Sequence, residues 1–385
     1  MVSFILILGG LSAFGPLTID MYLPALPLLA EDLNTTSSVA QLSLTACLVG
    51  LAVGQVLLGP YSDIHGRKKP LILSLMVYSL ASILCVFTTS ITLFILLRFI
   101  QGFAGSAGMV ISRASLRDLF SGAKLTKFFS LLMLVNGLAP ILAPVVGGQI
   151  LQFMSWRGVF AVLAAIGLVM LVSVFFGLRE SLASDRRKTG GVKEVIATYR
   201  LLLRDRVFVG YVLTQGFVMA AMFAYISGST FVLQETYGLT PQMFSFVFAL
   251  NGVGIILATQ TTGKLASYFR LETLLVTGLS LAGTSSVLLV LCSVLQAPIF
   301  YICALLFFVV ASVGIVNTSL FSLAMENQAE HAGTASALLG LLPFFLGALV
   351  APLVGLGNEA ISMSVVIAIC EGIAIGSYIR LVKTA

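Results

Sequence analysis

The chain has 385 residues, of which 59% are hydrophobic and only 9% are charged. Soluble globular domains carry about 25% charged residues, so this composition excludes an ordinary soluble protein and makes lipid the solvent for much of the surface. The net charge of +6 does not indicate nucleic-acid binding, because the basic residues form short clusters between apolar runs without an aromatic-interleaved basic patch. We interpret these clusters as membrane-topology signals.

Apolar runs long enough to cross a bilayer recur along the whole chain. A spanning helix needs about 20 consecutive apolar residues. We therefore expect twelve helices, at residues 3–24, 39–59, 70–88, 92–116, 126–152, 157–178, 207–234, 242–263, 272–293, 297–325, 332–356 and 360–380. The first run has neither the basic lead nor the cleavage site of a signal peptide, so we interpret it as a membrane span.

Lysine and arginine predict the orientation of these helices. With the N-terminus inside, the inner loops receive nearly all of the basic residues, and the outer loops receive Arg157 alone. This distribution predicts that both termini are cytoplasmic. The longest polar connection, residues 179–206, is expected to be a cytoplasmic linker between one six-helix bundle at 1–178 and another at 207–385.

The connection after the second predicted helix combines glycines with charged residues. Gly59 is expected to end that helix, and Gly66 permits a tight turn. Asp63 can cap a neighbouring helix N-terminus or pair with a cation. Gly263 is expected to end the eighth helix in the same way, before another basic turn. This weak internal repeat is typical of secondary transporters.

The fourth predicted helix contains an arginine, in the segment Arg98-Phe-Ile-Gln101-Gly102. A charged side chain inside a span is costly and is a functional hypothesis by default. The alternative is that Arg98 extends along the helix to place its charge at the outer surface.

The fifth predicted helix is rich in proline and glycine. It runs from Asn136 through Pro140 and Pro144 to Gly147 and Gly148. Prolines bend a helix, and glycines let neighbouring helices approach closely. The pattern indicates a helix that is bent and closely packed for a functional reason. The alternative is that the glycines only serve helix packing.

Together these segments resemble the signatures of the major facilitator superfamily, including its antiporter motif in the fifth helix. The whole chain is similar to the Bcr/CflA branch of the drug/proton antiporters. The segments that carry the resemblance are residues 17–27, 59–70, 98–102, 117–120, 136–148, 155–157 and 332–338. Ile64 departs from the family, which usually has Arg or Lys there.

The resemblance implies an all-α integral membrane protein with twelve transmembrane helices in two pseudosymmetric six-helix bundles around a central cavity. It implies the inner membrane of a bacterium and proton-coupled multidrug efflux by alternating access, with substrates such as bicyclomycin, chloramphenicol or sulfonamide-like compounds. The alternative is a proton-coupled exporter or importer of a physiological metabolite on the same fold.

Three ionisable residues inside predicted spans are candidates for proton coupling: Asp20, Arg98 and Glu371. In the family, the helices of Asp20 and Arg98 both face the cavity. Desolvation would favour a neutral Asp20 and a nearby Arg98 would favour the carboxylate, so Asp20 could take a proton outside and lose it inside. The alternative is a static ion pair or a helix-end cap. For Glu371, we favour a protonated carboxyl hydrogen-bonded to a neighbouring helix over an extra proton-coupling group.

Uncharged residues within the spans are candidates for the substrate cavity, which we expect to be mostly apolar with sparse polar anchors. They are Tyr22, Gln101, Asn136, Pro140, Tyr225, Asn251 and Asn317. The alternative role for each is to hold helices together within the membrane.

On the inner side, we expect a cytoplasmic latch that holds the outward-facing state. Its residues are Gly59, Asp63, Gly66, Arg67, Arg117 and Asp118. Arg67 is expected to pair with Asp118 at the foot of the fourth helix. Asp63 is expected to lie near the start of the eleventh helix, around residues 331–335, where exposed backbone N–H groups favour an anion.

Other functional classes lack support in the sequence. There is no HExxH, GxSxG or GxxxxGK[ST] motif and no repeated filter segment, which argues against an enzyme, ATP-driven export and a channel. The five cysteines lie in apolar runs without a CxxC pair, so we expect neither disulfides nor a metal site. We expect a monomer with no cofactor, driven by the proton gradient, whose partners are a small-molecule drug or metabolite, protons and the lipid bilayer.

Overall fold

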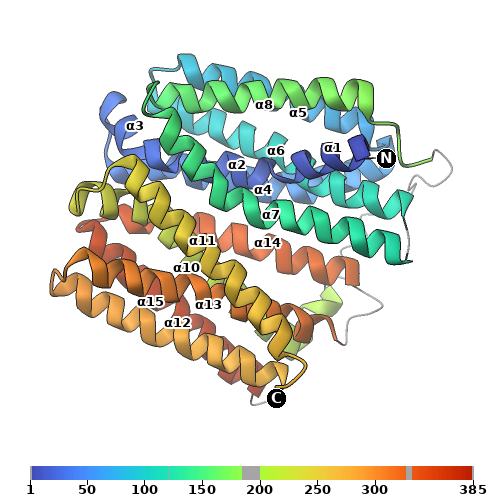
Figure 1. The fold of residues 1–385 in the computed structure, drawn as a ribbon. Helices are drawn as coiled ribbons and strands as arrows, with labels where there is room; N and C mark the ends of the chain where they lie inside the picture. Colours follow the sequence, from blue (N-terminus) through green and yellow to red (C-terminus); the bar gives the residue numbers. More distant parts are fainter. Residues whose placement is uncertain (1, 121, 184–199, 327–331, 384–385) are drawn as a thin grey trace. The chain divides into compact units, whose positions relative to one another are not determined.

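The structure is a computed structural model that describes residues 2–120, 122–183, 200–326 and 332–383. All regular secondary structure in this part of the chain is helical (Figure 1). Eleven of the described helices are long and apolar enough to cross a membrane, and a twelfth helix adds the apolar stretch Leu134–Ile150. These helices follow the order of the twelve predicted spans, so the prediction of an all-α membrane protein is confirmed.

The chain divides into two compact units, which we call unit 1 and unit 2. Unit 1 comprises Met1–Thr189 with Pro241–Ser245, and unit 2 comprises Gly190–Thr240 with Phe246–Ala385. The helices of unit 1 are α1 Val2–Ser12, α2 Phe14–Asp20, the 3-10 turn Leu23–Ala25, α3 Leu26–Asp32, α4 Ser37–His65, α5 Lys68–Phe87, α6 Ile91–Leu119, α7 Gly122–Ile150 and α8 Trp156–Gly177.

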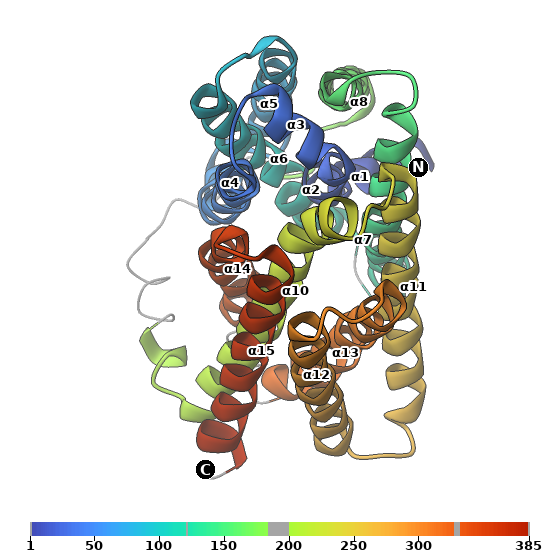
Figure 2. The same cartoon turned by 90° about the vertical axis from the view of Figure 1, so that its left-hand side faces the viewer.

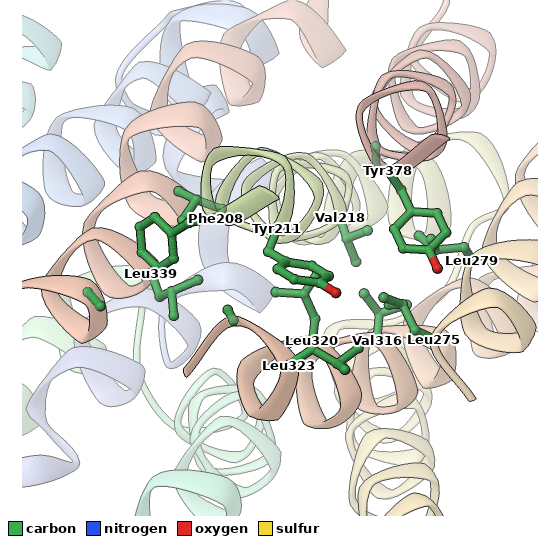
Figure 3. Close-up of a cluster of buried hydrophobic side chains, with 14 of the residues drawn as sticks. Phe208, Tyr211, Val218, Leu275, Leu279, Val316, Leu320, Leu323, Leu339 and Tyr378 are labelled. Atoms are coloured by element: carbon green, nitrogen blue, oxygen red, sulfur yellow. The ribbon is translucent and has the colours of Figure 1, made fainter. Parts of the chain in front are cut away.

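Unit 2 contains the remaining long helices, of which α11 begins in the short segment assigned to unit 1. They are α10 Arg206–Phe231 with the π-turn Val232–Thr236, α11 Pro241–Leu265, α12 Leu271–Val294, α13 Ile299–Met325, α14 Ala332–Val350 with the 3-10 turn Ala351–Gly355, and α15 Glu359–Tyr378 with the π-turn Ile379–Lys383. Figure 3 shows the apolar core of this unit, where Tyr211 and Val218 of α10 meet side chains such as Leu279 and Leu320.

Polar side chains begin several of these helices. Thr36 Oγ1 accepts a hydrogen bond from Val39 N at the start of α4, and Ser90 Oγ accepts one from Leu93 N at the start of α6. Asp205 Oδ1 accepts from the amides of residues 207 and 208 at the start of α10. Such caps satisfy backbone N–H groups that have no partner within the helix, so the sequence marks where these spans begin.

Helices α4 and α6 lie side by side and touch through their main chains (Figure 2). A Cβ atom added to Gly50 or Gly54 of α4 would overlap the backbone of Phe103, and one added to Gly102 of α6 would overlap the carbonyl of Cys47. Small residues allow this approach, and in a membrane close packing replaces the hydrophobic effect as the force between helices.

Two details of the predicted spans were wrong. The first span is not one continuous helix at 3–24, because it is broken after Asp20 and continues through α3 to Asp32. Gly59 and Gly263 do not end their helices, since α4 continues through Pro60 to His65 and α11 continues to Leu265. Membrane helices tolerate such interior residues because neighbouring groups satisfy the freed backbone atoms.

Candidate functional site

The break in the first span places a carboxylate at a helix end inside unit 1. Helix α2 ends at Asp20, and the chain then forms a short 3-10 turn that contains Pro24. Proline has no N–H and cannot continue the hydrogen-bonding pattern of an α-helix. Asp20 and Tyr22 therefore lie at an interruption of the helix, and both side chains are buried.

Arg98 of α6 occupies a fully buried position against this break, with 0% exposure. Its Nη2 donates a hydrogen bond of 2.8 Å to the backbone carbonyl of Thr18, and its Nη1 donates to Gln101 Oε1. The guanidinium lies over the ring of Tyr22, with 4.1 Å between Cζ and the ring centroid. Arg98 does not extend to the surface, so its charge is held inside the unit by a carbonyl, an amide and an aromatic face.

Asp20 does not form an ion pair with Arg98 within the described residues. Asp20 is 4% exposed, and its Oδ1 has no hydrogen-bond partner in the part of the chain that the structure describes. Arg98 contacts the residues on either side of it, Thr18 and Tyr22. An ionised carboxylate is costly to bury without a partner, so this arrangement suits a group that can carry a proton.

Hydroxyl groups of α5 complete the network, and they were not among the residues predicted from the sequence. Gln101 Nε2 donates to Ser82 Oγ at 2.7 Å. The Tyr78 hydroxyl lies 2.9 Å from Thr18 Oγ1. Tyr78 and Ser82 are one turn apart, so the spacing of two hydroxyls on one face of a predicted span was the available signal.

Helix α7 contacts the same break through one of its glycines. A Cβ atom added to Gly147 would overlap the backbone carbonyl of Met21, directly after Asp20. Asn136 Nδ2 instead donates to the carbonyl of Leu132 in its own helix, and Pro140 is partly buried within α7. Gly147 therefore allows α7 to pack closely against the break.

In unit 2, the predicted cavity residues form two separate contacts. Asn251 Nδ2 donates to the Tyr225 hydroxyl at 2.8 Å, and the ring of Tyr225 stacks on that of Phe248. Asn317 Nδ2 lies 3.2 Å from the sulfur of Met219, while its buried Oδ1 has no hydrogen-bond partner among the described residues. Aromatic rings beside amide groups are suited to binding amphipathic molecules.

Glu371 belongs to neither contact. It lies on α15 with 0% exposure, and both carboxyl oxygens lack a hydrogen-bond partner within the described residues. The expected hydrogen bond to a neighbouring helix is therefore absent from this part of the chain.

A second polar cluster, the Arg67 cluster, joins the end of α4 to the end of α6. It consists of Ser62, Asp63, Arg67 and Asp118. Arg67 Nη1 donates to Asp63 Oδ1 at 2.6 Å and to Ser62 Oγ at 2.7 Å, and its Nε donates to Asp118 Oδ2 at 2.8 Å. Burial lowers the pKa of Arg67, but hydrogen bonds and ion pairs with Asp118 and Asp63 outweigh this effect and raise the pKa above its usual value. The guanidinium stays charged.

Other residues predicted for this region take different positions. Gly66 has a φ of 87°, a conformation that suits glycine and that allows the turn before α5. Gly59 lies inside α4, where a Cβ atom would be 3.2 Å from Val110 of α6. Arg117 is exposed and has no hydrogen bond or ion pair within the described residues. The expected partner of Asp63 around residue 331 lies partly outside the described residues, so that contact stays a prediction.

Glu180, which was not predicted from the sequence, caps the start of α5. Its carboxylate accepts hydrogen bonds from Arg67 N at 2.8 Å and from Lys68 N at 3.2 Å. A negative charge is favourable at a helix N-terminus. More than 110 residues separate Glu180 from this helix start, so no local sequence pattern could have revealed the contact.

A third contact ties the end of α3 to the start of α8. Asp32 Oδ2 accepts from Trp156 Nε1 at 3.0 Å and from Arg157 Nη1 at 2.5 Å. Arg157 also donates to the carbonyl of Thr88 at 3.2 Å. Both partners of Asp32 belong to a segment that carried the family resemblance, and their role in unit 1 is to hold the broken first span.

Comparison with known proteins identifies the family. The model of the Major Facilitator Superfamily matches residues 6–352. The chain belongs to this superfamily. It is 43% identical, over 92% of its length and 88% of the relative, to the uncharacterized MFS-type transporter YdgK of Bacillus subtilis. It is 32% identical, over 91% of its length and 88% of the relative, to the bicyclomycin resistance protein homolog of Haemophilus influenzae.

A solved structure supports the fold. The crystal structure of a D-xylose–proton symporter matches with a TM-score of 0.75 at 18% identity, covering 99% of this chain and 97% of the symporter. This likeness concerns the fold alone. Family membership makes the chain a multi-pass membrane transporter rather than an enzyme. The predicted resemblance to the drug/proton antiporters of the Bcr/CflA branch is confirmed.

Proposed function

We propose that this transporter exports small amphipathic drugs in exchange for protons by alternating access, as a monomer in the inner membrane of a bacterium. The relation to a bicyclomycin resistance protein homolog supports a drug as the substrate. The observation that carries the proposal is Asp20, a buried carboxyl without a hydrogen bond on one oxygen, placed at the break of the first span.

In this proposal, Asp20 binds the proton and Arg98 organises the site around it. Arg98 fixes the carbonyl of Thr18 and the ring of Tyr22 on either side of Asp20. A proton arriving from outside would neutralise Asp20, and the loss of charge would favour rearrangement of the break. Each proton that crosses the membrane contributes about 2.3 kcal/mol per 100 mV, which is enough to drive a useful substrate gradient.

We infer the orientation from the basic residues, whose distribution favours a cytoplasmic position for both termini and for the Arg67 cluster. The cluster would act there as a latch of the outward-facing state. Its charge-assisted hydrogen bonds already hold the ends of α4 and α6 together within unit 1.

The test is drug efflux from cells and everted vesicles, with and without an uncoupler, using a panel that includes chloramphenicol and bicyclomycin. Asp20→Asn is expected to abolish pH-dependent efflux while the protein still inserts in the membrane. The matched control is Glu31→Gln, since Glu31 is an exposed acid on the same span. Wild-type pH dependence in Asp20→Asn would contradict the role of Asp20.

The panel also separates drug export from the transport of a metabolite. Efflux that depends on the proton gradient for several unrelated drugs supports the proposal. Proton-coupled movement of a metabolite with no response to any drug would replace the drug by that metabolite and leave the coupling role of Asp20 intact.

A further inference from the structure

Glu371 is a buried acid that the site around Asp20 does not use. It lies on the face of α15 that packs into unit 2, in line with Ile367, Ala374 and Tyr378. Its side chain is fully buried, and neither carboxyl oxygen has a hydrogen-bond partner within the described residues. The other members of this face fill a helix interface, whereas Glu371 brings an ionisable group into it.

The long helices packed against α15 are α10 and α12, and the short helical turns at residues 232–236, 351–355 and 379–383 also contact it. Thr214 Oγ1 of α10 lies 3.4 Å from the carbonyl of Ala374, and a Cβ atom on Gly283 of α12 would lie 2.8 Å from Ile375. Glu371 is one turn away from both contacts. The ionisable residues of these elements, with those of α15 itself, are Arg206, Tyr211, Tyr225, Glu235, Glu272, Cys292, Glu359, Cys370, Tyr378, Arg380 and Lys383. The cations among them are Arg206, in the first turn of α10, and Arg380 and Lys383, which follow the end of α15. No ion pair joins any of them to Glu371 within the described residues.

Neither form of the acid is satisfied in this arrangement. The carboxylate has no cation and no donor, so it is strongly disfavoured. The neutral acid is the better of the two, but its O–H has no acceptor, and a buried donor without a partner is also unfavourable. A residue that only packed the interface would have no such group to satisfy. The position of Glu371 therefore suits a carboxyl group that releases its proton when water enters the interface of α15 with α10 and α12.

We propose that Glu371 is a second proton-binding site of the transporter, located in unit 2 and separate from Asp20. The carboxyl holds a proton in the arrangement described here. It gives that proton to water when α15 separates from α10 and α12, and takes one from water before they close again. The involvement of this site in transport rests on the proposed proton-coupled function.

The first test detects the proton directly and needs no substrate. Infrared spectra of the full chain in liposomes are recorded from about pH 5 to about pH 10. Exposed acids are already largely ionised at about pH 5, so they contribute little to the carbonyl band of neutral acids. The carbonyl band of a buried neutral acid is expected to vanish as the pH rises. The band that disappears in Glu371→Gln, but not in Glu359→Gln, belongs to Glu371.

Two outcomes would overturn the proposal. A Glu371 band that persists over the whole range means that the acid is permanently neutral, and a band that is absent throughout means that it is permanently ionised. Should Glu371→Gln fail to fold, titration of Asp20→Asn decides the question, because that variant lacks the other buried acid of the proposed pathway.

The second test counts protons in transport. In proteoliposomes with chloramphenicol as the probe, Glu371→Gln is expected to move one proton fewer per drug molecule than the wild type. An unchanged ratio contradicts a role of Glu371 in the cycle. If the wild type moves no chloramphenicol or other drug, the proposed function fails, while the infrared titration still decides whether Glu371 exchanges its proton.

Discussion

Replacing Arg67 by alanine would remove the centre of the Arg67 cluster. The guanidinium is 6% exposed, and it joins Asp118, which is 14% exposed, to Asp63, which is 28% exposed. Without Arg67, the carboxylate of Asp118 keeps only the hydrogen bond from Ser181 within the described residues. The substitution therefore leaves a nearly buried carboxylate without its cation.

The expected loss of stability follows from these exposures. Removing one partner of a buried pair costs about 3–5 kcal/mol, whereas exposed pairs contribute about 0–1 kcal/mol. The exposure of the Arg67–Asp118 pair is close to that of a buried pair, and the exposure of the Arg67–Asp63 pair is intermediate between buried and exposed pairs. Arg67→Ala should therefore destabilise unit 1 by about 3 kcal/mol. This corresponds to a change on the order of 100-fold in the unfolding equilibrium.

The assay is reversible unfolding in mixed micelles, followed by tryptophan fluorescence. Trp156 is the single tryptophan of the chain and lies in unit 1, so it reports on the unit that contains the cluster. Arg117→Ala is the matched control, because Arg117 adjoins Asp118 but is exposed. The control should change stability by less than about 0.5 kcal/mol.

A double-mutant cycle of Arg67→Ala with Asp118→Asn decides whether the pair itself is responsible. Residues in one ion-pair network typically show coupling of about 0.5–3 kcal/mol, and this nearly buried pair should lie in the upper half of that range. Equal losses in Arg67→Ala and Arg117→Ala, or additive effects in the cycle, would show that the ion pair does not stabilise unit 1.

Three further predictions concern the site and its supports. Arg98→Ala should abolish efflux or shift its pH dependence, and its effect should be non-additive with that of Asp20→Asn in the vesicle assay, since independent effects would separate the two residues. Gly147→Leu should destabilise the protein by about 1–3 kcal/mol or more in the unfolding assay, because the new side chain would overlap the first span. Gly137→Leu is the control and should be tolerated, since a Cβ atom at Gly137 meets nothing within 4 Å. Glu180→Gln should cost about 0.5–1 kcal/mol in the same assay by weakening the cap of α5, and an unchanged midpoint would contradict that role.

The membrane architecture was predictable because it depends on local composition. Apolar runs of sufficient length showed the spans in order. The pairing of Arg67 with Asp118 was also expected, and it is present, because both residues fall at helix ends on the same predicted side. The break after Asp20 was missed, although Pro24 lay within the predicted helix and was the available signal.

The contacts of the buried charges were harder to predict. Arg98 was expected to act on the Asp20 carboxylate, yet it donates to the backbone of Thr18. This difference depends on how α6 packs on the broken first span, which the spacing of residues along one helix does not encode. The same holds for Glu371, which the sequence placed in a span without showing that it faces a helix interface rather than a hydrogen-bonding partner.

The main-chain contact between α4 and α6 has a practical consequence for measuring motion. A shift of one helix past the other would drive the carbonyls beside Gly50, Gly54 and Gly102 into the opposing backbone. Spin labels attached at Val53 and Leu96, whose side chains are exposed on these two helices, should therefore keep a constant separation during turnover. The distance between these two labels can therefore serve as an internal reference when the displacements of other helices are measured.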